Sequence, residues 1–188
     1  MSFWFYGYFN PNYLWIMCSS IIVNYLLSQL LQRKWEMSAA QIAVLKKSLL
    51  AIGLIFNLGL IFYFKYYDFF VDNLNKVFST DFQLKNIVLP LGISFFTFQQ
   101  VSYMVDSYRG ETKEYNFADY ALFVTFFPQL IAGPIVLHNE VLPQFEDKNN
   151  WKINWDNMAH GLYMFAAGLV KKAVIADTLS VSVAWGYG

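Results

Sequence analysis

The sequence predicts an all-α, polytopic membrane protein with about five transmembrane helices. Of its 188 residues, 57% are hydrophobic and 20% aromatic, whereas only 14% are charged. This balance lies outside the usual composition of soluble proteins. A spanning helix needs ~17–25 mostly apolar residues, and four charge-free stretches meet or approach that length: residues 1–32, 48–64, 86–105 and 120–139.

A single membrane domain over residues 1–188 is expected, with a fifth helix that Lys171, Lys172 and Asp177 interrupt. The first stretch has no basic start and no small-residue cleavage site, so we expect a retained span rather than a signal peptide. The longest polar stretches, 65–86 and 137–157, are expected as loops, the second with a short interfacial helix near 143–145. The predicted spans are 12–32, 47–64, 87–106, 119–137 and 157–180.

The loops predict an orientation. The first loop carries four basic residues, Arg33, Lys34, Lys46 and Lys47, whereas the segment before the first span carries none. Lysine and arginine collect in cytoplasmic loops. The N-terminus is therefore expected to be extracytoplasmic.

The third span combines a phenylalanine-rich face with a polar face. On a helix, five polar residues fall within roughly 160° of one another: Gln99, Gln100, Ser102, Tyr103 and Asp106. Polar groups inside a membrane must pair with protein or line an aqueous path. These residues are therefore candidates to line a substrate path; the alternative is hydrogen bonding between helices, with Asp106 paired to Arg109.

The fourth span contains Pro128, Gln129, Gly133 and Pro134. Each proline removes a helical hydrogen bond and clashes with the preceding turn, so a break or kink is expected. Broken backbone at membrane depth is tolerated where it is buried in protein or borders a cavity. Gln129 is thus a further path candidate, and a kink without function is the alternative.

Two histidines and a lysine pair complete the candidates. His138 follows the broken span and is expected to make a structural or gating hydrogen bond near the path, rather than to act as a general base. His160 opens the fifth helix and is interpreted similarly. Lys171 and Lys172 are expected to extend to the inner headgroups, or to attract an anionic acyl donor.

Several classes of site are not expected. Cys18 is the only cysteine, so it forms no intramolecular disulfide, and no residues have the spacing of metal ligands. Thirteen basic residues balance thirteen acidic ones, and no glycine-rich phosphate loop is found, so nucleic-acid binding and a bound cofactor are not expected.

Three blocks carry a family resemblance: LPLGISFFTFQQVSYMVDSYRG (89–110), FFPQLIAGPIVLHNEVLPQF (126–145) and GLYMFAAGLVKKAVIADTLS (161–180). Through them the chain resembles the N-terminal part of membrane-bound O-acyltransferases, in the bacterial alginate O-acetyltransferase branch. Leu137 departs from the family pattern, which often places a basic residue before the histidine. This departure puts an anion-binding role at that position in doubt.

The resemblance implies a multi-pass enzyme of the inner cell membrane. Such an enzyme transfers an acyl group, usually acetyl, to hydroxyls of an extracytoplasmic polysaccharide such as alginate. The implied donor is acetyl-CoA or an acyl carrier. The implied partners are membrane lipid, the polysaccharide and an extracytoplasmic acetyltransferase. A histidine acting as general base would activate the acceptor hydroxyl.

No catalytic residue is assigned within this chain. The family's catalytic histidine lies in a Trp-His-Gly-type motif further downstream, and Ala159 precedes His160 and Gly161 here. The chain is therefore expected to be an N-terminal fragment that is inactive alone. Two other classes stay open: a transporter or channel fragment with a polar intramembrane path, and a noncatalytic membrane scaffold. A second interrupted helix in an inverted repeat would favour transport.

Overall fold

The computed structural model describes residues 7–8, 11–113, 115–126, 133 and 136–187. Every regular element within these residues is a helix, which confirms the all-α prediction. The chain divides into two compact units, Met1–Pro143 and Gln144–Gly188. The single membrane domain over the whole chain stays a prediction.

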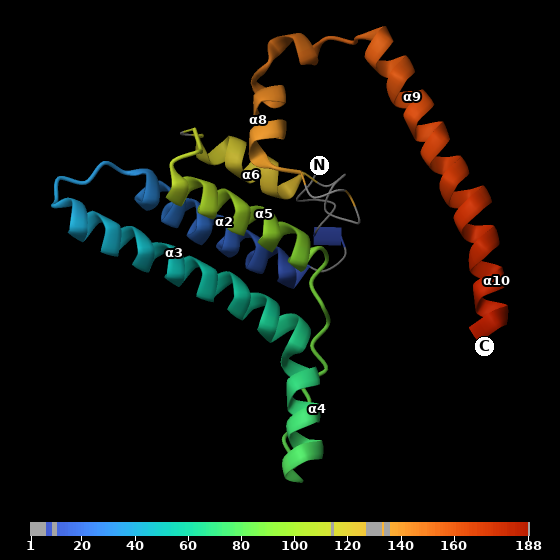
Figure 1. Cartoon of the computed structure of the whole chain (residues 1–188), viewed down its shortest axis with the longest axis horizontal. Helices are drawn as coiled ribbons and strands as arrows, with labels where there is room; N and C mark the ends of the chain where they lie inside the picture. Colours follow the sequence, from blue (N-terminus) through green and yellow to red (C-terminus); the bar gives the residue numbers. More distant parts are fainter. Residues whose placement is uncertain (1–6, 9–10, 114, 127–132, 134–135, 188) are drawn as a thin grey trace. The chain divides into compact units, whose positions relative to one another are not determined.

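The first unit begins with two long helices, α2 (Pro11–Gln32) and α3 (Ala39–Ile61) (Figure 1). α3 begins eight residues before the predicted boundary at 47, because a capping box precedes it. The backbone N–H of Gln41 donates to Ser38 Oγ, and the Ser38 N–H donates to Gln41 Oε1 at 3.2 Å. Such a box satisfies two N–H groups that a helix start otherwise leaves unpaired.

The helix does not end where the polar stretch 65–86 begins, so the predicted loop is wrong over its first half. α3 continues through a π-helical segment, η1 (Phe62–Tyr66), into α4 (Tyr67–Phe78). α4 is amphipathic, with apolar side chains at helical spacing, and this supports a helix even where charges are frequent. The chain changes direction at η1 (Figure 1).

Two described helices are long and apolar enough to cross a membrane: Tyr13–Gln32 and the continuous helix Ala39–Phe78. They include the first two predicted spans. The other three predicted spans contain helices but do not meet this criterion within the described residues. A five-span topology therefore stays a prediction.

α5 (Ile93–Arg109) packs against both α2 and α3. It begins six residues after the predicted start at 87, because Gly92 adopts a left-handed conformation at φ 66°, which a right-handed helix does not contain. In Figure 1 the three helices lie side by side. The polar block of the sequence thus lies within a three-helix core.

The predicted fourth span is not a single helix. α6 (Phe117–Thr125) begins at the cap residue Asn116 and contacts α2 and α5, and its last helical residue is Thr125. Gly133 is not helical, and neither are residues 136–137. The predicted break is therefore confirmed, whereas Gln129 lies outside the described residues. α8 (His138–Glu146) follows and confirms the short helix expected near Pro143.

The second unit contains η2 (Lys148–Trp151) and then a helix in three parts: α9 (Trp155–Val170), η3 (Lys171–Ala176) and α10 (Asp177–Tyr187). A helix was predicted over 157–180, and the observed one is longer. The π-helical part coincides with the polar interruption that the sequence shows. Lys172 there pairs with Asp177.

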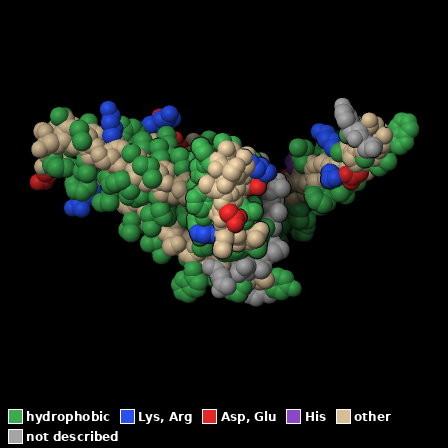
Figure 2. Space-filling view, turned by 90° about the horizontal axis from the view of Figure 1, so that it is seen from below, with side chains coloured by type: hydrophobic (Ala, Val, Ile, Leu, Met, Phe, Trp, Pro, Cys, Tyr) green, Lys and Arg blue, Asp and Glu red, His purple; other side chains and the backbone are tan. Residues whose placement is uncertain are grey.

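The core of the first unit is formed by side chains from α2, α5, α6 and α8. Its largest fully buried apolar and aromatic residues are Met17, Ile21, Leu31, Ile93, Phe96, Tyr103, Met104, Tyr120, Phe123 and Leu142. The exterior is also apolar. Figure 2 shows hydrophobic side chains over most of the face turned to the viewer. Such a surface is typical of a protein that is surrounded by lipid or by other helices.

Candidate functional site

Four fully buried polar side chains link α2, α3 and α5, and we call Ser20, Asn24, Asn57 and Gln100 the amide cluster. Asn24 Nδ2 donates to Asn57 Oδ1 at 3.2 Å and to Gln100 Oε1, and Asn57 Nδ2 donates back to Asn24 Oδ1 at 2.6 Å. Ser20 Oγ donates to Gln100 Oε1 at 3.1 Å. Hydrogen bonds of this kind hold membrane helices together. The side-chain oxygen of Gln100 therefore makes the hydrogen bonds between helices that were the alternative to a role in the path.

The other atom of the same amide has a different environment. Gln100 Nε2 is buried and has no hydrogen-bond partner among the described residues. The same is true of Thr97 Oγ1 and the Tyr103 hydroxyl, which follow one side of α5 over about 9 Å at 1.5 Å per residue. On α6, the Tyr120 hydroxyl is also without a partner. We call Thr97, Gln100, Tyr103 and Tyr120 the polar row.

Buried polar atoms without partners are uncommon, because each costs ~1–3 kcal/mol relative to a satisfied one. In native proteins such groups are satisfied by ordered water or by a ligand. The polar row therefore presents donors and acceptors of the kind that pair with water or with hydroxyl groups. This chemistry matches what a path for a hydroxylated substrate requires.

His138 lies at one end of the polar row and is only 2% exposed. Its ring packs edge-on against Tyr103, with centroids 5.0 Å apart, and against Tyr115 and Phe123 at 6.3 and 6.4 Å. Its Nδ1 is 3.5 Å from Asp106 Oδ2, a distance that allows an ion pair, but the geometry is not that of a hydrogen bond. The sequence-based pairing of Asp106 with Arg109 is not among the ion pairs of the described residues.

His138 follows the fourth predicted span and lies outside it. Burial lowers the pKa of His138 below its usual value near 6.5, and the carboxylate of Asp106 opposes this shift. The unfolded chain then binds the proton more tightly than the folded chain. The neutral histidine therefore stabilises the fold above about pH 6.5, and this stability is lost as the pH falls through the folded pKa.

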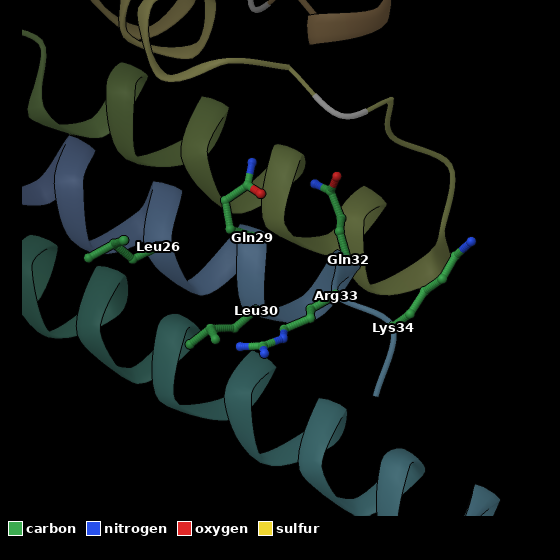
Figure 3. Close-up of a pocket in the computed structure, with 6 residues that line it drawn as sticks. All are labelled: Leu26, Gln29, Leu30, Gln32, Arg33 and Lys34. Atoms are coloured by element: carbon green, nitrogen blue, oxygen red, sulfur yellow. The ribbon is translucent and has the colours of Figure 1, made fainter. Parts of the chain in front are cut away.

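An open groove of about 540 Å³ lies at the C-terminal end of α2 (Figure 3). Gln29 and Gln32 extend from it toward α5, where Gln32 Nε2 donates to Ser107 Oγ at 3.0 Å. The Gln32 side chain also lies near the Tyr103 side chain and interacts with it. The positions of Gln32 Oε1 and the Tyr103 hydroxyl do not meet the geometry of a hydrogen bond between them. The groove is lined by Leu26, Gln29, Leu30, Gln32, Arg33 and Lys34.

Most of the path candidates from the sequence meet in the first unit. Gln99, Gln100 and Tyr103 are buried on α5, and Asp106 and His138 approach each other at its C-terminal end. The structure does not test their role in a path. The other candidates lie elsewhere: Gln129 is outside the described residues, and Lys171 and Lys172 are exposed in η3 of the second unit.

Sequence reasoning missed several polar residues of the core. Ser20 and Asn24 lie in the first charge-free stretch and Asn57 in the second, where their surroundings are apolar. The available signal was their spacing, since Ser20 and Asn24 are four residues apart and therefore share a helix face. Tyr120 was missed because tyrosine at a helix end also fits the interfacial belt. No group of metal-ligating side chains occurs among the described residues.

Comparison with known proteins identifies the family to which this chain is similar. The profile of MBOAT, the membrane-bound O-acyltransferase family, matches residues 72–184. A peptidoglycan O-acetyltransferase of Helicobacter pylori is 40% identical over 211 aligned residues, which cover 99% of this chain and 39% of that protein. Probable alginate O-acetylases AlgI of Pseudomonas aeruginosa and Azotobacter vinelandii are 35% and 33% identical over 95% of this chain.

The chain spans only 34% and 35% of those two alginate O-acetylases, and thus less than two fifths of each of the three relatives. No solved structure matches it. The family profile covers more than half of the chain and includes all of α5, His138 and the lysine pair. The chain belongs to the membrane-bound O-acyltransferase family.

Proposed function

We propose that this sequence belongs to an inner-membrane enzyme that transfers an acetyl group to hydroxyls of an extracytoplasmic polysaccharide. Family membership supports acyl transfer in a membrane. The relatives from Helicobacter, Pseudomonas and Azotobacter are all named for O-acetylation, which favours acetyl as the group and a glycan as the acceptor. These names favour an acyltransferase over a transporter or a scaffold.

In the proposed reaction, the acceptor hydroxyl oxygen bonds to the carbonyl carbon of the donor thioester, and the carbon–sulfur bond breaks. The hydroxyl proton passes to a general base and then to the departing thiolate. The donor is acetyl-CoA or an acyl carrier, and Lys171 and Lys172 are candidates to attract its phosphates. We assign no residue of this chain to the base, because the Trp-His-Gly-type motif does not occur in it.

The first unit contributes part of the path through the bilayer in this proposal. The observation that supports it is the polar row, whose buried hydroxyls and Gln100 amide nitrogen make no hydrogen bond among the described residues. A chain of five spans with an extracytoplasmic N-terminus would place the two ends of α5 near opposite membrane faces. An extracytoplasmic acetyltransferase is a candidate partner on the acceptor side.

The path can be tested with two conservative substitutions in the enzyme that carries this sequence. Tyr120→Phe removes a hydroxyl without a hydrogen-bond partner among the described residues, and Tyr103→Phe removes one that only approaches Gln32. Removing an unsatisfied buried polar atom leaves stability unchanged or raises it. A role in the path instead predicts lower acetylation turnover at unchanged stability. Tyr66→Phe, at a tyrosine that is 45% exposed, is the matched control.

Ester-linked acetate in the purified polymer is measured at matched expression, together with the thermal unfolding midpoint. Full turnover in both variants would contradict the path. The acceptor is identified separately: the gene is deleted and restored, and acetate is measured in purified peptidoglycan and in exopolysaccharide. Acetate that depends on the gene in neither polymer would contradict polysaccharide O-acetylation.

A further inference from the structure

The continuous helix Ala39–Phe78 is longer than a membrane is thick. Its 40 residues correspond to a path of about 60 Å along the helix axis at 1.5 Å per residue, with a change of direction at η1, whereas the hydrocarbon core is ~30 Å thick. The charge-free part, residues 48–64, covers about 26 Å and ends at Lys65. α4 therefore lies beyond the hydrocarbon core, on the side of the membrane opposite to Lys46 and Lys47.

The chain after α4 folds back along the helix instead of leaving it. Asn75 Oδ1 accepts the backbone N–H of Phe82 at 2.9 Å, and Asn75 Nδ2 donates to the Phe82 carbonyl at 2.9 Å. The Asp68 carboxylate accepts the N–H of Lys85 at 2.8 Å and of Ile87 at 3.2 Å. We call α4 with residues 79–89 the strapped hairpin.

The strap carries one basic residue, Lys85, whose ammonium group contacts aromatic rings. Lys85 Nζ lies over the rings of Tyr67 and Tyr63, 4.6 and 5.0 Å from their centroids. Contacts between a cation and aromatic faces contribute ~0.5–2 kcal/mol each, more where water is excluded. On another side of α4, Asp72 pairs with Lys76. The Lys85 ammonium group is thus engaged by aromatic rings, and most of the other side chains between helix and strap are apolar.

This space is a groove of about 870 Å³, lined by Phe62, Tyr67, Phe70, Val71, Leu74, Phe82, Gln83, Leu84, Lys85 and Ile87. Of these side chains only Val71 is buried, and Phe82 is 58% exposed. Contiguous apolar surface of this kind is unusual for a part of a protein that faces water. An apolar partner is needed to cover it.

The connections of the hairpin identify that partner. At one end it continues from α3, and at the other it leads within a few residues into α5, which packs against the two span-length helices α2 and α3. Both flanks therefore enter the bilayer, and the hairpin cannot move away from its surface. Tyrosine, phenylalanine and lysine are typical of the headgroup depth.

We propose that the strapped hairpin lies in the headgroup region and that its groove takes the acyl chains of membrane lipids. The apolar side of the hairpin then faces the lipid, and the Asp72–Lys76 side faces water, as in an interfacial amphipathic helix. This site is separate from the polar row and does not depend on the acetyl-transfer proposal. It requires only that the protein is embedded in a membrane, as its family is.

The test uses the enzyme that carries this sequence, with its native cysteines replaced, in lipid nanodiscs. Single cysteines at Phe70→Cys and Phe82→Cys receive an environment-sensitive fluorophore, and Lys76→Cys on the polar side is the matched control. Lipids brominated on their acyl chains should quench the two groove probes, and aqueous iodide should quench the control.

Two outcomes overturn the proposal. If brominated lipids quench the control as strongly as the groove probes, the groove has no preference for lipid. If neither brominated lipid nor iodide quenches the groove probes, protein covers the groove, either from elsewhere in the enzyme or from a partner. A correctly inserted enzyme is confirmed for every variant by its elution as a single species.

Discussion

Replacing Asn57 by alanine tests whether the amide cluster holds the first unit together. Asn57 and Asn24 exchange two hydrogen bonds between α3 and α2, of 2.6 and 3.2 Å. A third bond, from Asn57 Nδ2 to the Gly53 carbonyl at 2.8 Å, lies within α3. Only the first two are lost between helices when the side chain is truncated.

The expected loss follows from these two bonds. Hydrogen bonds between membrane helices are worth ~0.6–1.7 kcal/mol each, so Asn57→Ala should lower the free energy of unfolding by about 1–3 kcal/mol. Asn24→Ala should cost a similar amount or more, since Asn24 also donates to Gln100 Oε1 on α5. Because the two residues share their bonds, the double variant should cost less than the sum of the single variants.

The assay is denaturant unfolding of the purified enzyme in detergent, with the four proteins of the double-mutant cycle measured together. Leu58→Ala, at an adjacent position that is 58% exposed, is the matched control for truncation in α3. A cost for Asn57→Ala no larger than that of the control would refute the reasoning. Strict additivity in the cycle would show that the two amides do not stabilise each other.

Three further outcomes are expected. Gly53→Ala should destabilise the enzyme by ~1–3 kcal/mol, because the new Cβ would overlap the thioether of Met104, which is fully buried and has little room to move; the loss measured by unfolding should shrink in a Met104→Ala background, and an equal loss there would contradict the clash. Acidification below about pH 6.5 should lower the unfolding midpoint, because burial lowers the pKa of His138 in the folded chain. His138→Phe should reduce this pH dependence. Identical curves of unfolding midpoint against pH for the variant and the parent enzyme would exclude His138 as the source. Asp68→Ala should speed hydrogen exchange at the Lys85 and Ile87 amides, and unchanged exchange would show that the carboxylate does not hold the strap.

The sequence predicted the polar face of α5, because polar residues in an apolar run are conspicuous. Gln100 and Tyr103 were identified on one face, and both are buried. The sequence could not predict which polar atoms of these side chains would have hydrogen-bond partners. The carbonyl oxygen of Gln100 is held by α2 while its amide nitrogen is not, and that difference depends on where Asn24 lies in space.

Helix boundaries were predicted less well where the local charge of a segment and its apolar periodicity indicate different structures. Residues 65–86 carry charges and were expected as a loop, yet α4 forms because its apolar residues recur at helical spacing and continue an existing helix. The break expected from Pro128 and Pro134, in contrast, follows from local backbone geometry alone. α6 ends at Thr125 and Gly133 is not helical, so the segment is interrupted, although the two prolines themselves lie outside the described residues.

The sequence by itself determined the all-helical class, the apolar character, the interruption of the fourth segment and, through three blocks of residues, the family. Each depends on composition, on helical periodicity or on backbone chemistry that acts within a few residues. Only the tertiary structure decided that Asp106 faces His138 rather than Arg109, that Ser20, Asn24, Asn57 and Gln100 meet, and that Asp68 holds a strap along α4. These contacts join residues that are 17 to 80 positions apart or lie on different helices, so they depend on how the helices pack and not on any local pattern.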